Sequence, residues 1–255
     1  MEILFLGGLA LVLGFILAIS SALMAVEKDE RVEAIADILP GINCGACGFS
    51  GCLNYAEALV AKKTQNGLCP PGGQACSEAV AQIMGEEAAI IQRKIAVLMC
   101  QGHNCNRKSK LIYDGLATCE GANLLYGGNR DCQYGCLGCG DCAASCPEGA
   151  IAIIDGLALI KSRRCIGCGI CQKHCPKDLL EVIPDRFTHH VKCRNKDRGA
   201  LARKVCQVSC IGCFKCTKVC AAQAISVKDH VATIDYNRCT NCGLCKDACP
   251  TSAIT

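Results

Sequence analysis

A cysteine pattern that recurs four times in the second half of the chain constrains this protein more than any other feature. Each copy has the spacing CxxCxxCxxxC. This spacing is typical of thiolate ligation of [4Fe-4S] clusters in bacterial-type ferredoxins. A repeat of this kind also dictates architecture, so we predict two tandem two-cluster ferredoxin domains, residues 133–184 and 208–255, of the α+β class. The copies are Cys136, Cys139, Cys142 and Cys146; Cys165, Cys168, Cys171 and Cys175; Cys210, Cys213, Cys216 and Cys220; and Cys239, Cys242, Cys245 and Cys249.

The fourth cysteine of each run is expected to serve the neighbouring cluster. In two-cluster ferredoxins it reaches across to the other cube, because it cannot close on its own without strain. The trailing cysteine of one run would therefore complete the site begun by the other run of the pair. The expected sets are Cys136, Cys139 and Cys142 with Cys175; Cys165, Cys168 and Cys171 with Cys146; Cys210, Cys213 and Cys216 with Cys249; and Cys239, Cys242 and Cys245 with Cys220.

A β-hairpin is predicted between the two runs of each pair. Residues 150–161 would turn at Asp155 and Gly156, a dipeptide that favours a type I′ hairpin turn, and residues 224–235 would turn near Asp229. Each pair of runs therefore reads as one small domain.

Composition supports this chemistry. The chain of 255 residues has 27 cysteines and no Trp, and an odd cysteine count in a long chain argues against a disulfide scaffold. Cluster ligation needs thiolates, which places the chain in a reducing compartment. The formal net charge of +4 counts no thiolates, and about six clusters of charge −2 would lower it to roughly −8. We therefore expect no nucleic-acid partner.

The N-terminus carries a long apolar run. Ile3–Val26 has no charged side chain. As a helix, this run would be long enough to cross a hydrocarbon core of about 30 Å. We predict a single transmembrane anchor over residues 1–26, with a cleaved signal peptide as the weaker alternative. Lys28 and Arg31 follow the run, so the C-terminal bulk would face the cytoplasm from the cell (inner) membrane. Small residues recur at every fourth position of this run, at Ala10, Gly14, Ala18 and Ala22. They fit either close contact with a partner helix or a plain lipid-facing anchor.

The segment 27–90 is predicted to be a small α-helical [4Fe-4S] domain. A helix over 29–39 precedes the first cysteine group, and Cys52 would lie in the first turn of a further helix, where the positive helix end favours an anionic cluster. Zinc is the alternative, because four cysteines alone satisfy its tetrahedral coordination. The group is Cys44, Cys47, Cys52 and Cys69.

The segment 91–132 is predicted to connect the domains, with a strand over 94–99. Its cysteines either bind an extra cluster or are buried small apolar residues; they are Cys100, Cys105, Cys119 and Cys132. Three more cysteines have no quartet to join, so structural burial is expected for Cys76, Cys193 and Cys206.

The segment 185–207 is read as a basic insert between the two ferredoxin domains. It is either a solvated loop or a docking surface for an acidic protein. Since the chain has no GxGxxG motif and no Walker loop, we expect neither a nicotinamide nor a flavin site, and no catalytic residue. The basic residues of the insert are Arg186, Lys192, Arg194, Lys196, Arg198, Arg203 and Lys204.

The order of these parts resembles the B subunits of Rnf complexes over essentially the whole chain. The apolar N-terminus is followed by GINCGACGFSGC and GLCPPGG, and then by the tandem ferredoxin motifs. The resemblance implies a membrane-bound ferredoxin:NAD+ oxidoreductase, a translocase that couples electron flow to Na+ or H+ transport. This chain would carry about five or six [4Fe-4S] clusters. It would take electrons from reduced ferredoxin and pass them to other membrane and flavin-carrying subunits.

Two other functions remain as alternatives. An iron–sulfur subunit of another membrane oxidoreductase would use the same chemistry. A cluster scaffold or redox sensor is the alternative from a different class, and a sensor would need an effector domain that the sequence does not indicate.

Overall fold

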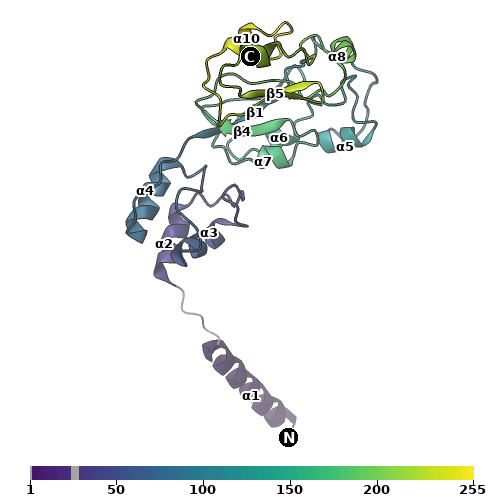
Figure 1. Ribbon diagram of the computed structural model, residues 1–255. Coiled ribbons are helices and arrows are strands. Elements are labelled where there is room, and N and C mark those ends of the chain that lie inside the picture. Colours follow the sequence, from purple (N-terminus) through teal and green to yellow (C-terminus); the bar gives the residue numbers. More distant parts are fainter. Residues whose placement is uncertain (1, 24–28) are drawn as a thin grey trace.

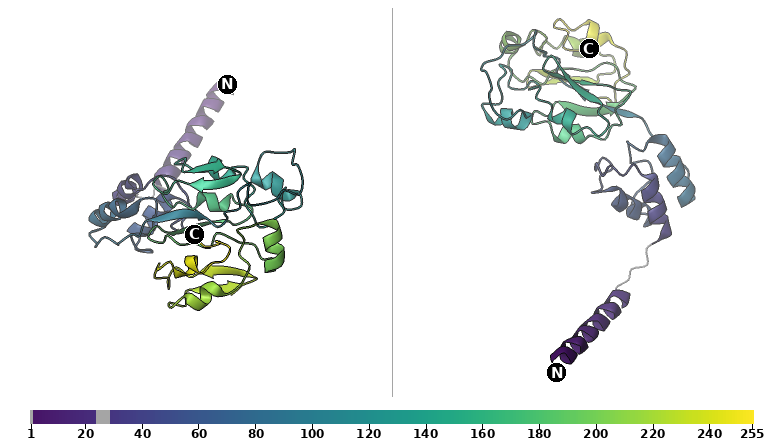
Figure 2. Two further views of the ribbon diagram at one scale, coloured as in Figure 1. Left: turned by 90° about the horizontal axis from the view of Figure 1, so that it is seen from above. Right: turned by 180° about the vertical axis from the view of Figure 1, so that it is seen from behind.

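The computed structural model describes residues 2–23 and 29–255. One helix near the N-terminus, a small helical unit and a larger part with three short two-stranded sheets follow one another along the chain (Figure 1). The two ferredoxin-like halves of the larger part lie side by side (Figure 2). The α+β class with a small helical domain before tandem ferredoxin-like units is therefore confirmed.

The first helix, α1 (Glu2–Leu23), stands apart from the other elements (Figure 1). Among residues 2–23 and 29–255, no helix combines the length and the apolar character required to cross a membrane. The transmembrane anchor predicted for residues 1–26 is therefore not supported by the structure. Residue 1 and residues 24–26 of that segment lie outside the described residues.

All three helices of the helical unit contribute buried side chains to one core, among them Ile35, Tyr55 and Val80. Asp29 caps the first of them, because its carboxylate accepts from the backbone N–H of Arg31 at 3.0 Å. The helix predicted over 29–39 is thereby confirmed. The helices are α2 (Glu30–Ile38), α3 (Cys52–Val60) and α4 (Gly73–Met84).

Both predicted hairpins are present. Their central residues all have positive φ, 49° at Asp155 and 70° at Gly156, 46° at Asp229 and 60° at His230, as a type I′ turn requires. The strands are β2 (Ile151–Ile154), β3 (Leu157–Ile160), β5 (Ile225–Lys228) and β6 (Val231–Ile234), and each hairpin pairs in antiparallel register.

The predicted strand over 94–99 is confirmed, but it does not merely connect domains. As β1 (Lys94–Leu98), it pairs antiparallel with β4 (Leu180–Pro184), which follows the second cysteine run. The start of the segment 91–132 is therefore part of the first ferredoxin-like unit, because its backbone hydrogen-bonds to the end of that unit.

The insert 185–207 plays the corresponding role in the second unit. Val191 forms a β-bridge with Ile254, and His190 and Thr255 exchange backbone hydrogen bonds of 2.9 and 3.1 Å. The insert is thus attached to the C-terminus of the chain and is not a free loop.

The remaining helices are short. Four of them place the third cysteine of a run in the first turn, and each begins directly after a residue of positive φ. These four are α6 (Asp141–Ala144), α7 (Ile170–Lys173), α9 (Lys215–Val219) and α10 (Leu244–Asp247); the other two are α5 (Cys119–Leu124) and α8 (Gly199–Val205).

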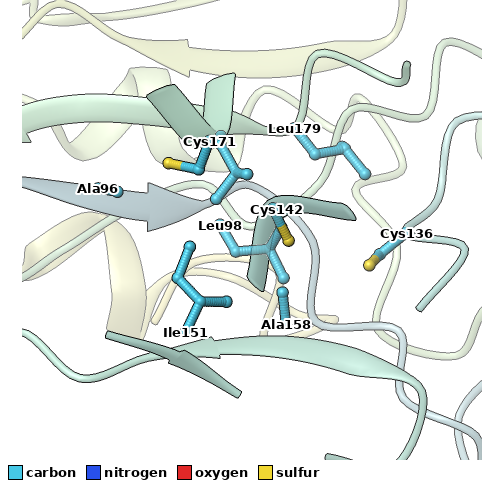
Figure 3. Packing of buried hydrophobic residues seen from close by; sticks show 9 residues of the cluster. Ala96, Leu98, Cys136, Cys142, Ile151, Ala158, Cys171 and Leu179 are labelled. Atoms are coloured by element: carbon cyan, nitrogen blue, oxygen red, sulfur yellow. The ribbon is translucent and has the colours of Figure 1, made fainter. Parts of the chain in front are cut away.

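Cysteines form a large part of the core of the first unit. Ala96, Leu98 and Ile151 pack in one buried cluster with Cys142 and Cys171 (Figure 3). This arrangement explains the scarcity of aromatic residues, since the space at the centre of the unit is walled by thiols.

Candidate iron–sulfur centres

The cysteine runs form tight loops that wrap around a hollow. The residue before the second cysteine of each run has positive φ, namely Gly138, Gly167, Gly212 and Asn241. A side chain is excluded at three of these positions. A Cβ on Gly138 would overlap the backbone of Gly156, one on Gly167 would lie 2.6 Å from the carbonyl oxygen of Lys94, and one on Gly212 would lie 2.9 Å from that of His230. The backbone therefore turns sharply enough to aim successive cysteines inward.

Three cavities bring together cysteines of three exchanged sets, all of them except Cys139. The trailing cysteine of one run borders the cavity of the other run in each case. The cavity-lining cysteines are Cys136, Cys142 and Cys175; Cys146, Cys165, Cys168 and Cys171; and Cys210, Cys213, Cys216 and Cys249. Cys119 also borders the first of these cavities.

Backbone N–H groups are directed at the trailing sulfurs. Each trailing cysteine accepts a hydrogen bond from the residue four positions later, a type of contact that tunes cluster potentials. The donors are Ala150 to Cys146 at 3.3 Å, Leu179 to Cys175 at 3.4 Å, Ala224 to Cys220 at 3.3 Å and Ala253 to Cys249 at 3.2 Å. Cys220 thus accepts the same hydrogen bond as the other three, although it is followed by Ala221 where the others are followed by proline.

Burial controls the charge of these thiols. Burial, with smaller contributions from neighbouring cysteines, raises the pKa of Cys142 and of Cys171 to about 12 and that of Cys216 to about 11. Without iron the buried thiols are therefore neutral at pH 7. Ligation releases their protons, because the thiolate is the metal ligand. The residues fit an iron–sulfur cluster, which supplies one-electron carriage when bound.

The structure also gathers three of the four cysteines of the first group, without Cys44. Cys47, Cys52 and Cys69 pack together at the helical unit's core. Cys52 begins α3, as predicted, and its backbone N–H donates to Asn43 Oδ1 at 2.8 Å. Cys76 joins them, because a Cβ on the nearby Gly72 would meet the sulfurs of both Cys76 and Cys69, at 2.8 and 3.3 Å.

The predicted group of Cys100, Cys105, Cys119 and Cys132 is not brought together. Cys105 is exposed, and its sulfur lies 2.9 Å from Nδ1 of His103. Cys119 lies beside Cys139. Burial is the main cause of the raised pKa of Cys139, and Cys119 is the next. Cys100 and Cys132 instead line a fourth cavity with Cys193 and Cys206, two cysteines for which only structural burial was expected.

Comparison with known proteins agrees with these sites. One family model, for an Fe-S cluster, matches residues 39–71, and another, for a 4Fe-4S dicluster domain, matches residues 135–179 and 209–253. The B subunit of an ion-translocating oxidoreductase complex from Methanosarcina acetivorans is 38% identical over 98% of this chain and 95% of its own length. This chain belongs to the family of Rnf B subunits.

Two further relatives agree with that assignment. The B subunit of the Na+-translocating ferredoxin:NAD+ oxidoreductase complex of Acetobacterium woodii is 40% identical over 98% of this chain and 75% of its own length. The B subunit of the proton-translocating ferredoxin:NAD+ oxidoreductase complex of Clostridium ljungdahlii is 40% identical over 96% and 88%. As an Rnf B subunit with matches to both models, the chain carries several [4Fe-4S] clusters. The match over residues 39–71 favours a cluster over zinc in the first group.

Proposed function

We propose that this chain is the iron–sulfur electron-transfer subunit of an ion-translocating ferredoxin:NAD+ oxidoreductase complex. It would take electrons from reduced ferredoxin and deliver them to other membrane and flavin-carrying subunits. The family membership supports the complex, and the arrangement of the cysteine sites supports the role within it. The observation that carries the proposal is that these sites succeed one another through the fold.

The first step of this succession joins the helical unit to the first ferredoxin-like unit. Lys173 donates from Nζ to the carbonyl oxygen of Cys44 at 2.8 Å. Burial raises the pKa of Cys168, and the nearby Cys44 thiol raises it further. The first cysteine group therefore adjoins the site completed by Cys146.

The next steps run within and between the ferredoxin-like units. In the first unit, cysteines of both sites pack in a single core, and the same holds for the second unit. The fourth cavity, with Cys100 and Cys193 in its wall, lies between them. Each cysteine site thus adjoins the next, so the sites form a row. An electron carrier requires such a row, because electrons must pass from one cluster to a neighbouring one.

A basic hollow, defined here as the surface lined by Lys110, Lys177, Arg194 and Lys196, is our proposed docking site for ferredoxin. Asp178 is the single acidic residue that lines it. The hollow shares Lys177 with the cavity of Cys175, and Arg194 with the fourth cavity. An acidic protein bound here would lie close to two cysteine sites.

The basic insert is only partly free to dock a partner. Arg194 forms an ion pair with Glu181, and Arg186 stacks over the Phe187 ring at 4.7 Å. Arg203 and Lys204, at the end of α8, are exposed. These two provide a matched control for the basic hollow.

The double variant Lys110→Glu/Lys196→Glu is expected to be reduced by ferredoxin about tenfold more slowly at low salt. Both side chains are exposed, and rim charges act mainly on the encounter rate. The difference should shrink as salt shortens the Debye length to about 8 Å and below. Stopped-flow absorbance of the full chain mixed with reduced ferredoxin measures it, with a small uncharged reductant as reference.

The control Arg203→Glu/Lys204→Glu makes the same change in net charge on α8. It should react with ferredoxin at nearly the parental rate. Equal slowing of both variants would show a nonspecific charge effect. Slowing of the control alone would move the docking site to α8.

We also propose, from the uncharged sequence Ile3–Val26, that the N-terminal segment anchors the protein to the cell membrane with its C-terminal bulk in the cytoplasm. Deleting residues 1–26 should move the protein from the membrane fraction to the soluble fraction. Its cluster content should be unchanged, because every candidate ligand lies beyond residue 40. A deletion variant that still sediments with membranes, or the full chain in the soluble fraction, would refute the anchor.

A further inference from the structure

We propose that Cys100, Cys132, Cys193 and Cys206, which line one cavity between the two ferredoxin-like units, bind an additional [4Fe-4S] cluster. Two of the four precede the first unit's cysteine runs, and two precede those of the second. The site would therefore belong to neither unit alone. The proposal rests on the proposed electron-transfer function and deepens it, since the added cluster would lie between the sites of the first unit and those of the second.

An internal repeat relates Cys100 to Cys193. In the first unit, Leu98 pairs with Leu180, the fifth residue after the trailing cysteine. In the second unit, Val191 pairs with Ile254, again the fifth residue after the trailing cysteine. Cys100 and Cys193 each follow the paired residue by two positions, so the fold places them equivalently.

The same repeat relates Cys132 to Cys206. Each precedes the first cysteine of its unit's first run by four positions, in the sequences CQYGC and CQVSC. The four cysteines are thus two equivalent pairs. A symmetric quartet is what two facing repeats would supply to one shared cluster.

The cavity offers the same room as the predicted ferredoxin sites. The cavity volume is about 20 Å³ in the fourth cavity and in each of the three ferredoxin cavities. Buried Gly102 forms part of its wall, and a Cβ there would lie 3.4 Å from the sulfur of Cys206 and 3.8 Å from that of Cys100. The two sulfurs therefore face the same space from different repeats.

Asn195 gives the quartet the hydrogen bonds that the ferredoxin sites have. Its side chain is 1% exposed. Its backbone N–H donates to the sulfur of Cys193 at 3.5 Å, and its Nδ2 points to the sulfur of Cys132 at 3.6 Å. The first contact repeats the one at Cys239, whose sulfur accepts from the N–H of Asn241, also two positions on, at 3.3 Å.

Two cationic residues border the cavity, although its lining surface is mainly apolar, as in the ferredoxin cavities. These residues are Lys192 and Arg194. A [4Fe-4S] core with four thiolates carries a charge of about −2, which the two cations would offset.

The position of the quartet makes the row of sites continuous. Gly135, next to Cys136, and Ser209, next to Cys210, both line the fourth cavity. Cys100 also packs against the buried cluster that contains Cys136. The quartet therefore adjoins a ferredoxin site on either side.

The test is the number of intact [4Fe-4S] clusters in the anaerobically purified full chain, counted by Mössbauer spectroscopy with total iron. Cys193→Ala is expected to lose one cluster, about four irons per chain. Cys132→Ala/Cys193→Ala should lose no more than that, because both residues would serve the same cluster. Cys105→Ala, an exposed cysteine outside the cavity, is the matched control and should lose none.

A second variant guards against misfolding. In Cys206→Ser the hydroxyl can still bind iron, so either one reduction potential shifts or one cluster is lost, while the others are unchanged. The proposal would be overturned if Cys193→Ala kept the parental number of clusters and Cys206→Ser showed neither a shifted reduction potential nor a lost cluster. Loss of a cluster in Cys105→Ala would overturn it in favour of a different quartet. The count does not depend on reduction by ferredoxin, so it is independent of the proposed partner.

Discussion

Replacing Cys146 by alanine is expected to destroy the cluster bound by Cys165, Cys168 and Cys171 and to spare the one bound by Cys136. Cys146 follows Cys142 in the sequence, but its sulfur borders the cavity of the other run. Loss of a fourth thiolate from a buried site leaves one iron without a protein ligand, so the whole site should fail. The measurement is the number of intact [4Fe-4S] clusters, with the parent chain as reference.

Double variants decide which site each trailing cysteine serves. Cys146→Ala/Cys165→Ala should lose one cluster, because both residues serve the same site. Cys146→Ala/Cys136→Ala should lose two, about eight irons per chain. Cys136→Ala/Cys175→Ala should lose one cluster, as Cys136→Ala alone does, because both residues serve the same site. The reverse pattern would rule out the exchange while leaving the two-cluster unit intact.

Local spacing explains why the ferredoxin sites could be predicted from the sequence. Each run carries its own geometry, since the interval of three positions and the left-handed residue before the second cysteine define the loop by themselves. The hairpin at Asp155 and Gly156 is equally local, because those two residues favour the turn that the strands require. The same holds for the helix that Asp29 caps.

The cysteines of the fourth cavity could not be grouped from the sequence, because they meet only through pairing between distant segments. Cys100 and Cys193 come together only after β1 pairs with β4 and Val191 pairs with Ile254. Nearness in sequence favoured Cys105 and Cys119 in place of Cys193 and Cys206. A signal was present in the matching CQYGC and CQVSC sequences, which extend the repeat upstream of the cysteine runs.

The basic insert shows a second limit of sequence reasoning. A run of basic residues reads as a solvated surface, yet Arg194 pairs with Glu181 and Lys192 is half-buried, with its pKa lowered by burial. The residues that line the basic hollow come from three separate segments, around Lys110, Lys177 and Lys196. Only the fold shows that they share a surface.

The most direct test of the account is the cluster content of the anaerobically purified full chain, together with its redox titration followed by EPR. A chain of ferredoxin-type sites predicts about 20 irons and as many sulfides from the five quartets with recognised spacing, and about 24 with the quartet between the two units. Every cluster should be reduced and reoxidised reversibly by one electron. About 16 irons or fewer in fully loaded protein would contradict the five quartets. Clusters that transfer to apo-proteins and do not cycle would contradict the role of an electron carrier.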